Sequence, residues 1–161
     1  MCKDQNMQRI VYTIGHSNRS MQEFIELLND FKIKVLVDVR RFPTSRIVPQ
    51  FNKDNLEKEL KKHGIMYVWL GTYLGGYRVK GYINYMKTPQ FNEGLQKLIQ
   101  IIEQAQGNVA IMCSEKLWFR CHRRFIANKL VEMGYQVYHI TDKKKGYLHK
   151  LRPITNYSKR T

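Results

Sequence analysis

The segment Asn108–Ile140, NVAIMCSEKLWFRCHRRFIANKLVEMGYQVYHI, decides the fold class of this chain. It begins with Asn108–Cys113, a short apolar run of strand length. A segment with helix-spaced apolar residues follows and ends at Gly134, and a second strand-like run, Tyr135–Ile140, comes next. A strand, a helix and a strand in this order predict a right-handed crossover between two parallel strands of one sheet.

The same alternation extends towards the N-terminus. Strand-like runs at Arg9–Ile14, Lys34–Val39 and Ile65–Leu70 are separated by segments with the apolar spacing of helices. Ser20 and Glu23 have the S-x-x-E spacing of a capping box, which marks the start of the first helix. The chain is therefore predicted to be α/β, a single compact domain with a mostly parallel sheet of about five strands flanked by helices.

The predicted domain spans residues 1–141, and residues 142–161 are predicted to form a basic C-terminal tail because they show no clear periodicity. The segment Gly71–Lys87 is predicted to be irregular. Its tyrosines are interleaved with Arg and Lys, a composition that suits stacking on the bases of single-stranded nucleic acid. A chain of 161 residues has the usual length for one domain.

Composition limits the class of protein. No apolar run approaches the roughly 18 residues that a membrane span needs, so no membrane association is expected. The first residues lack the apolar stretch of a secretory signal, and we expect a cytoplasmic protein. The three cysteines, Cys2, Cys113 and Cys121, are too few for a disulfide scaffold, so reduced thiols are expected.

The formal net charge of +15 is large for this length. Such a charge attracts polyanions, and it predicts nucleic acid or a phosphate-containing ligand as the partner. The alternative is that the charge serves solubility alone. The oligomeric state cannot be inferred from the sequence.

Titratable residues gather where the predicted strands end. The first strand runs into His16 and Ser17, the second into Asp38, and the fourth into Cys113 and Glu115. Ligands bind at the carboxyl ends of the strands in open parallel sheets. We therefore predict that His16, Asp38, Cys113 and Glu115 converge in one cleft at this edge of the sheet.

Five motifs carry a family resemblance. They are YTIGHS (Tyr12–Ser17), LVDVRRFP (Leu36–Pro43), LGG (Leu74–Gly76), MCSE (Met112–Glu115) and CHR (Cys121–Arg123). Together they resemble the domain-of-unknown-function family 488, over a stretch from about Tyr12 to Ile140. The resemblance implies a compact α/β domain, and the family carries no established activity.

The candidate site residues fall into two groups by chemistry. The groups that could transfer protons or attack a substrate are His16, Asp38, Cys113, Glu115 and His122. Those that could bind the substrate or its phosphate are Ser17, Arg40, Arg41, Arg120 and Arg123. For Glu115, burial is expected to require a partner such as Arg120 or Arg123.

The cysteines allow three interpretations. Cys113, Cys121 and His122 with Glu115 are ligand types that suit zinc, but the C-x7-C-H spacing is not that of known zinc modules, so neither a metal nor a cofactor is predicted. Cys113, placed at a helix N-terminus among arginines, would have a lowered pKa and could be a nucleophile. Both cysteines could also be small buried residues that only pack.

These observations leave three functional hypotheses. The first is an enzyme that acts on a nucleic acid or a nucleotide-like anion by acid/base chemistry, such as hydrolysis or glycosyl transfer. The second is a nucleic-acid-binding domain without catalysis. The third is a thiol-dependent redox or transfer protein built on Cys113 and Cys121.

Overall fold

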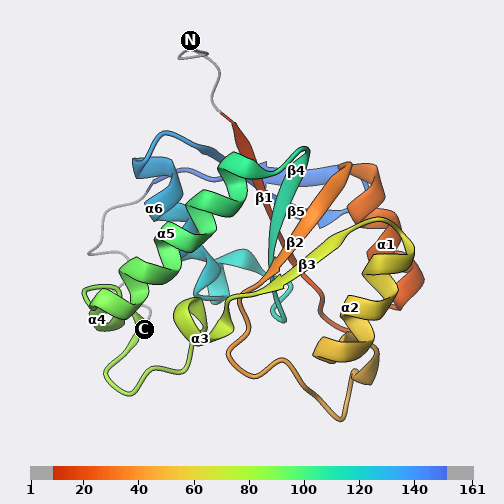
Figure 1. Cartoon of the computed structure of the whole chain (residues 1–161), viewed down its shortest axis with the longest axis horizontal. Helices are drawn as coiled ribbons and strands as arrows, with labels where there is room; N and C mark the ends of the chain where they lie inside the picture. The colour runs from red at the N-terminus through yellow and green to blue at the C-terminus, as the bar shows by residue number, and fades with distance from the viewer. Residues whose placement is uncertain (1–8, 152–161) are drawn as a thin grey trace.

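A computed structural model describes residues 9–151 of the chain. Six strands form one sheet in the order β3-β2-β4-β1-β5-β6 (Figure 1). The strands are β1 (Ile10–Gly15), β2 (Ile33–Asp38), β3 (Met66–Trp69), β4 (Asn108–Cys113), β5 (Gln136–Asp142) and β6 (Lys145–Leu148). The helices are α1 (Met21–Asp30), α2 (Lys53–Lys62), α3 (Gly71–Leu74), α4 (Tyr82–Tyr85), α5 (Pro89–Gln104) and α6 (Arg123–Glu132). Two 3₁₀ turns are η1 (Pro49–Phe51) and η2 (Trp118–Arg120).

The sheet is mostly parallel, which confirms the predicted fold class. All pairings from β3 to β5 are parallel, and β6 alone is antiparallel, to β5. The strand β6 lies within the segment predicted as a basic tail, so the sheet extends beyond residue 141. Lys144 adopts a left-handed conformation (φ 54°) in the turn between the two strands. That turn lacks the usual Asn-Gly or Asp-Gly signal of a hairpin. Residues 152–161 of the predicted tail lie outside the described residues.

Helices cover both faces of the sheet (Figure 1). On one face, Phe24 and Leu28 of α1 and Leu56 of α2 pack against the strands. On the other face, Leu98 of α5 and Ile126 of α6 do the same. Strand interiors that are apolar on both faces are typical of a parallel sheet between two helical layers. Within residues 9–151, no helix is both long and apolar enough to cross a membrane.

The segment Gly71–Lys87, predicted to be irregular, contains the short helices α3 and α4. A single helical turn is too short to show apolar periodicity in the sequence. Its shape depends on tyrosine hydroxyls instead, since Tyr82 donates to the carbonyl oxygen of Leu74 (2.7 Å) and Tyr85 to that of Tyr73 (2.6 Å). These bonds hold α4 against α3 beside the carboxyl edge of the sheet.

Candidate functional site

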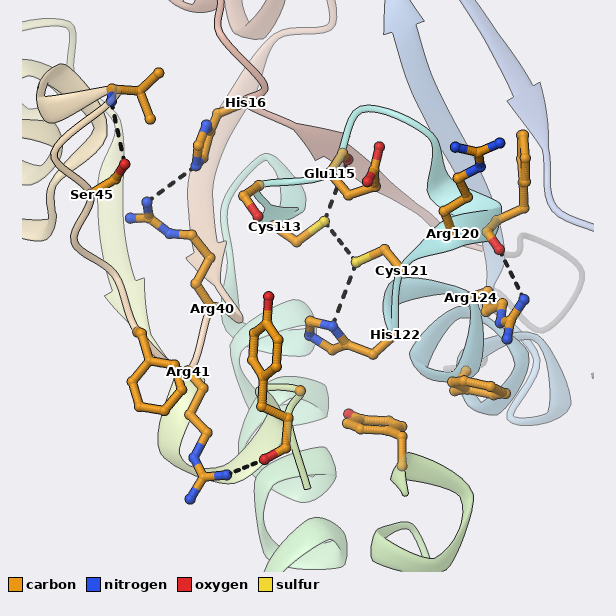
Figure 2. Close-up of a pocket in the computed structure, with 18 of the residues that line it drawn as sticks. His16, Arg40, Arg41, Ser45, Cys113, Glu115, Arg120, Cys121, His122 and Arg124 are labelled. Carbon is orange, nitrogen blue, oxygen red and sulfur yellow. Dashed lines mark hydrogen bonds between the residues drawn. The ribbon is translucent and has the colours of Figure 1, made fainter. Parts of the chain in front are cut away.

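A cavity of about 980 Å³ opens at the carboxyl ends of β1, β2 and β4 (Figure 2). Seven of the residues predicted for the site line it: His16, Arg40, Arg41, Cys113, Glu115, Arg120 and His122. The predicted convergence therefore holds for His16, Cys113 and Glu115. Asp38 is fully buried behind Arg40, and the two form an ion pair.

Backbone contacts bring the two loops at this edge together. The amide of His16 donates to the carbonyl oxygen of Cys113 (2.9 Å), and the amide of Ser17 donates to that of Ser114 (2.9 Å). Only glycine fits at position 15, because a Cβ atom there would lie 1.8 Å from the carbonyl oxygen of Glu115. The approach of β1 to the loop after β4 thus depends on a missing side chain.

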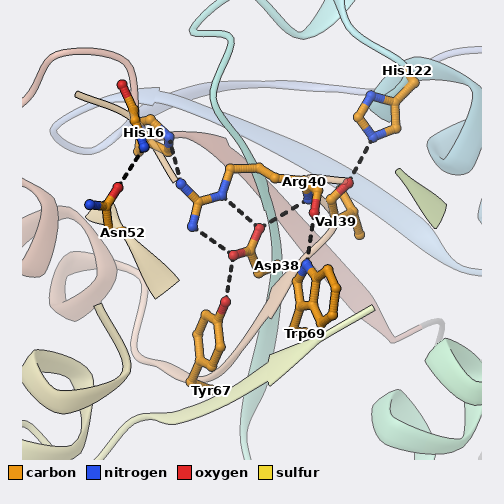
Figure 3. Close-up of polar contacts among 9 residues, drawn as sticks. His16, Asp38, Val39, Arg40, Asn52, Tyr67, Trp69 and His122 are labelled. Atoms are coloured by element: carbon orange, nitrogen blue, oxygen red, sulfur yellow. Dashed lines mark hydrogen bonds and ion pairs between the residues drawn. The ribbon is translucent and has the colours of Figure 1, made fainter. Parts of the chain in front are cut away.

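Asp38 fixes the position of Arg40 (Figure 3). The Arg40 Nε and Nη2 atoms donate to its two carboxylate oxygens, at 2.9 and 2.7 Å, and the Arg40 backbone amide also donates to it. The Tyr67 hydroxyl donates to Oδ2 at 2.6 Å. A bidentate pair of this kind holds a guanidinium in one orientation. Tyr67, which the sequence places in a strand core, therefore supports the site from behind.

His16 is held in its neutral form. Its Nδ1–H donates to the carbonyl oxygen of Ser17 (2.8 Å), and its Nε2 accepts from Arg40 Nη1 (3.2 Å). Its ring stacks on Phe51, with 4.4 Å between the centroids. Burial, with a smaller contribution from Arg40, lowers the pKa of His16 to about 4. Both ring nitrogens are therefore engaged at neutral pH.

Two thiols meet at the cavity. The Sγ atoms of Cys113 and Cys121 lie 2.8 Å apart, and Figure 2 shows them facing each other beside His122. Cys121 lies two residues before the start of α6, and its sulfur accepts the backbone N–H of Arg123 at 3.4 Å. The thiol thus lies at a helix N-terminus, where the helix dipole favours a thiolate.

His122 presents one nitrogen to Cys121. Its Nε2 donates to the carbonyl oxygen of Val39 (3.1 Å), which fixes the tautomer because a carbonyl can only accept. Its Nδ1 therefore faces the Cys121 sulfur, 3.5 Å away. Gly76 leaves room for this ring, since a Cβ atom there would lie 3.2 Å from Nδ1. Cys121 and His122 form a thiol–imidazole pair.

The two thiols differ in acidity. The hydrogen bond between the two sulfurs lowers the pKa of Cys121 well below its ordinary value, against the effect of burial, and His122 and Arg123 lower it further. Burial raises the pKa of Cys113 well above its ordinary value, and its hydrogen bond to Cys121 adds to this. The prediction of a lowered pKa for Cys113 is therefore wrong. Helix α6 begins at Arg123, so Cys121 occupies the position that the sequence analysis gave to Cys113.

The family described as Domain of unknown function DUF488 matches residues 20–130, more than half of the chain. The chain belongs to the DUF488 family. Neither the curated proteins nor the solved structures compared with it gave a match. The DUF488 match includes both thiols and the Asp38–Arg40 pair, whereas His16 lies just before it.

Three predicted site residues of this DUF488 chain have other surroundings than expected. Arg123 is buried (1% exposed), and it donates to Thr13 Oγ1 and to the carbonyl oxygen of Glu115 rather than to its carboxylate. Glu115 is exposed, and its carboxylate accepts the backbone N–H of Leu117. Ser17 is half-buried and is not among the residues that line the cavity. The residues that follow the predicted strands indicate which edge of the sheet holds the site. They do not predict the direction in which each side chain points.

Several lining residues were not among the predicted catalytic or binding residues, although Cys121 was considered as a thiol and as a possible metal ligand. They are Cys121, Arg124, Tyr82, Phe119 and Phe125. Arg124 donates to the carbonyl oxygen of Phe119 (2.9 Å) while its guanidinium lies over the Phe125 ring. For Cys121 a signal existed, because the thiol precedes a run of helix-spaced apolar residues.

The donor set does not suggest a metal centre. Within the part of the chain that the structure describes, no group of three or more His, Cys, Asp or Glu side chains is placed to hold a metal ion. His122 directs its Nε2 to a backbone carbonyl, and Cys113 places its sulfur 3.6 Å from another, that of Glu115. The chemistry of the site is therefore argued below from its thiols, imidazole and guanidinium groups.

Proposed function

We propose that this DUF488 protein is a thiol-dependent enzyme that acts on an anionic substrate. Cys121 is the nucleophile, and His122 is its proton-transfer partner. One observation carries the proposal: the Cys121 sulfur lines the cavity, at the N-terminus of α6 and 3.5 Å from an imidazole nitrogen whose tautomer is fixed. A thiolate is the reactive form of cysteine, and each of these features stabilises it.

Arginines make the cavity suitable for an anion. Arg40, Arg41, Arg120 and Arg124 line it, with Glu115 as the carboxylate among the lining residues. A guanidinium has five N–H donors, and Arg40 uses three of them on Asp38 and His16. Arg41 and Arg120 are more exposed than Arg40. Phosphate, which accepts such forks, is the anion that fits best.

The chemical step follows from this geometry. The Cys121 thiolate attacks the electrophilic atom of the substrate, and the bond from that atom to the leaving group breaks. The proton that the thiol gave to His122 Nδ1 passes to the leaving group. Water or a second acceptor then releases the group bound to sulfur. Both thiols must be reduced beforehand, as in the cytoplasmic location that the sequence predicts.

The acid/base hypothesis has less support from the same geometry. Its candidate groups are His16, Asp38, Glu115 and His122, and the reactive atoms of the first two are already engaged. His16 Nε2 accepts from Arg40, and the Asp38 carboxylate accepts from Arg40 and Tyr67. A base whose lone pair is occupied cannot take a substrate proton until that bond is broken.

The rate of alkylation by iodoacetamide, measured against pH and assigned by peptide mapping, tests the nucleophile. Cys121 should react at pH 6, where an ordinary thiol with a pKa of about 8.5 is almost unreactive. His122→Asn should move the reaction to higher pH, with Cys113→Ser as a second variant for comparison. If Cys121 titrates like an ordinary thiol, the proposal fails.

The same reaction tests the anion site. Inorganic phosphate or pyrophosphate should slow the alkylation of Cys121, and Arg120→Ala should weaken this protection. A matched control is Arg46→Ala, which removes an exposed arginine that is not among the lining residues. Equal protection in all three proteins would contradict an arginine-lined anion site.

A second candidate, nucleic-acid binding, is favoured by the aromatic rim of the cavity. Phe42 and Tyr77 are 62% and 83% exposed, their ring centroids lie 6.0 Å apart, and the Arg41 guanidinium lies over Phe42. Exposed rings beside arginines are stacking platforms for single-stranded bases. Affinity for a single-stranded oligonucleotide should fall as salt rises. The double variant Phe42→Ala/Tyr77→Ala should weaken binding, and no binding at low salt would rule this candidate out.

A further inference from the structure

The second thiol, Cys113, takes no part in the nucleophilic step proposed for Cys121. Cys113 is 2% exposed, and its sulfur lies 2.8 Å from that of Cys121. A disulfide bond is about 2.0 Å long, so roughly 0.8 Å of approach would join the two sulfurs. The residues come from different elements, the end of β4 and the loop before α6, and they are eight positions apart in the chain.

We propose that Cys113 and Cys121 are a dithiol that reduces an anionic disulfide, with Cys121 as the attacking thiol and Cys113 as the resolving thiol. This inference rests on the proposed function, because it uses the same nucleophile and the same arginine-lined cavity. It names the substrate class: a disulfide that carries carboxylate or phosphate groups.

The first step is thiol–disulfide exchange at Cys121. Its thiolate attacks one sulfur of the substrate, a new bond forms between that sulfur and Cys121, and the substrate S–S bond breaks. The departing thiolate takes the proton held by His122 Nδ1. Arg41 and Arg120, at the cavity, receive the negative groups of the substrate. Attack through a thiolate and departure of a thiol are the usual steps of this exchange.

The second step completes the electron balance. Cys113 attacks the Cys121 sulfur, a Cys113–Cys121 bond forms, and the remaining half of the substrate leaves with the proton of Cys113. The substrate disulfide gains two electrons and two protons and becomes two thiols, while the protein dithiol becomes a disulfide. A small-molecule dithiol, as external reductant, returns the protein to its starting state.

The environments of the two thiols fit these roles. An attacking thiol needs access to substrate and a stabilised thiolate, which Cys121 has at the cavity and at the helix N-terminus. A resolving thiol needs to be protected from substrate and close to its partner. Cys113 is buried, and its thiol is held between the Cys121 sulfur and the carbonyl oxygen of Glu115.

The experiment uses the full chain with Cys2→Ser, which leaves Cys113 and Cys121 as its cysteines. The probe is dithiobis(nitrobenzoate), an anionic aryl disulfide whose released thiol absorbs visible light. Folded protein should release two equivalents of this thiol and lose two hydrogens in mass, with no adduct. Adding Cys113→Ser should give one equivalent and a stable adduct on Cys121, and adding Cys121→Ser should slow release at least about tenfold.

Charge selectivity tests the substrate class. The anionic probe should react faster than cystamine, a cationic disulfide, and Arg120→Ala should reduce this preference while Arg46→Ala should not. Equal rates for both probes would overturn the anionic class.

Two outcomes separate the two proposals. If the protein with both thiols keeps a stable adduct on Cys121, Cys113 does not resolve it, and the dithiol inference fails while the thiol enzyme stands. If Cys121 is unreactive in folded protein, the proposed function fails as well. Cys113→Ala, as a second substitution, and a thermal unfolding curve for each variant distinguish loss of chemistry from loss of folding.

Discussion

Two polar clusters contain imidazole groups, and they differ in what their polar atoms are free to do. The first is the thiol–imidazole pair, in which Cys121 and His122 line the cavity. The second is a chain of hydrogen bonds behind it. Its members, in order of donation, are Arg123, Thr13, His139, His149 and Asn128.

From Thr13 to Asn128, the second cluster is a continuous chain of hydrogen bonds. Asn128 Oδ1 accepts from His149, so His149 Nδ1 accepts from His139 Nε2, and His139 Nδ1 accepts from Thr13. Trp118 covers His139 with parallel rings, 4.4 Å apart. A continuous chain of buried hydrogen bonds rigidifies the interior. We therefore expect the imidazole groups of the second cluster to serve stability, whereas His122, which lines the cavity, is the one proposed to transfer a proton.

The largest effect should come from Cys121→Ser, which removes the nucleophile and leaves the packing nearly unchanged. Reaction with an anionic disulfide should fall by about 100-fold or more, because a hydroxyl has no comparable nucleophilicity at neutral pH. The free energy of unfolding should change by less than about 1 kcal/mol. Stopped-flow kinetics and urea unfolding measure the two quantities. A variant that keeps the wild-type rate would show that another group reacts.

The next largest effect should come from His139→Ala. This substitution should lower the free energy of unfolding and leave the reactivity of Cys121 nearly unchanged. It leaves Thr13 and His149 without their partner and opens a cavity under Trp118. The free energy of unfolding should fall by about 3 kcal/mol. The alkylation rate of Cys121 in the folded fraction should stay within about threefold of the wild type. A stable variant with an unreactive Cys121 would mean that the two clusters are not separate.

Acid should destabilise the protein through its buried histidines. Burial lowers the pKa of His139 to about 2 and that of His16 to about 4, whereas both are near 6.5 in the unfolded chain. Between about pH 6 and 4 the unfolded chain therefore binds more protons than the folded chain. This contribution to stability is complete above pH 6.5 and is lost as the pH falls, by up to about 2.7 kcal/mol per pH unit for the two groups together.

Urea unfolding at pH 7, 6 and 5 measures this dependence. His139→Asn should reduce the slope by one proton, about 1.4 kcal/mol per pH unit. An unfolding free energy that is constant from pH 7 to 5 would contradict the neutral, buried state of these imidazoles.

The smallest effect should come from Tyr67→Phe, which removes the hydroxyl that donates to Asp38. The free energy of unfolding should fall by about 1–2 kcal/mol, as for a hydrogen bond to a charged group. The reaction rate of Cys121 should not change, since Tyr67 supports Arg40 and not the thiols. A comparison of phosphate protection in this variant and in the wild type then isolates the contribution of the Arg40 orientation to anion binding.

Much of the fold could be predicted because strand and helix patterns are local. The capping box at Ser20 and Glu23 is present, as predicted. The strand β6 could not be predicted, since it is short and gains its order by pairing with β5. The sequence predicted at which edge of the sheet the candidate site lies. The carboxyl ends of parallel strands meet at that edge whichever side chains follow them.

The sequence by itself determined the α/β class, the strand ends that hold His16, Asp38 and Cys113, and the DUF488 family. Only the tertiary structure decided that Cys121, rather than Cys113, lies where an imidazole and a helix N-terminus stabilise its thiolate. That position depends on how far the loop after β4 runs before the helix begins. Trp118, which follows β4, stacks on His139, and the two residues are 21 positions apart in the chain. Because a contact over that separation leaves no local pattern, the sequence placed Cys121 before a helix but did not show that its sulfur meets Cys113 and His122 at the cavity.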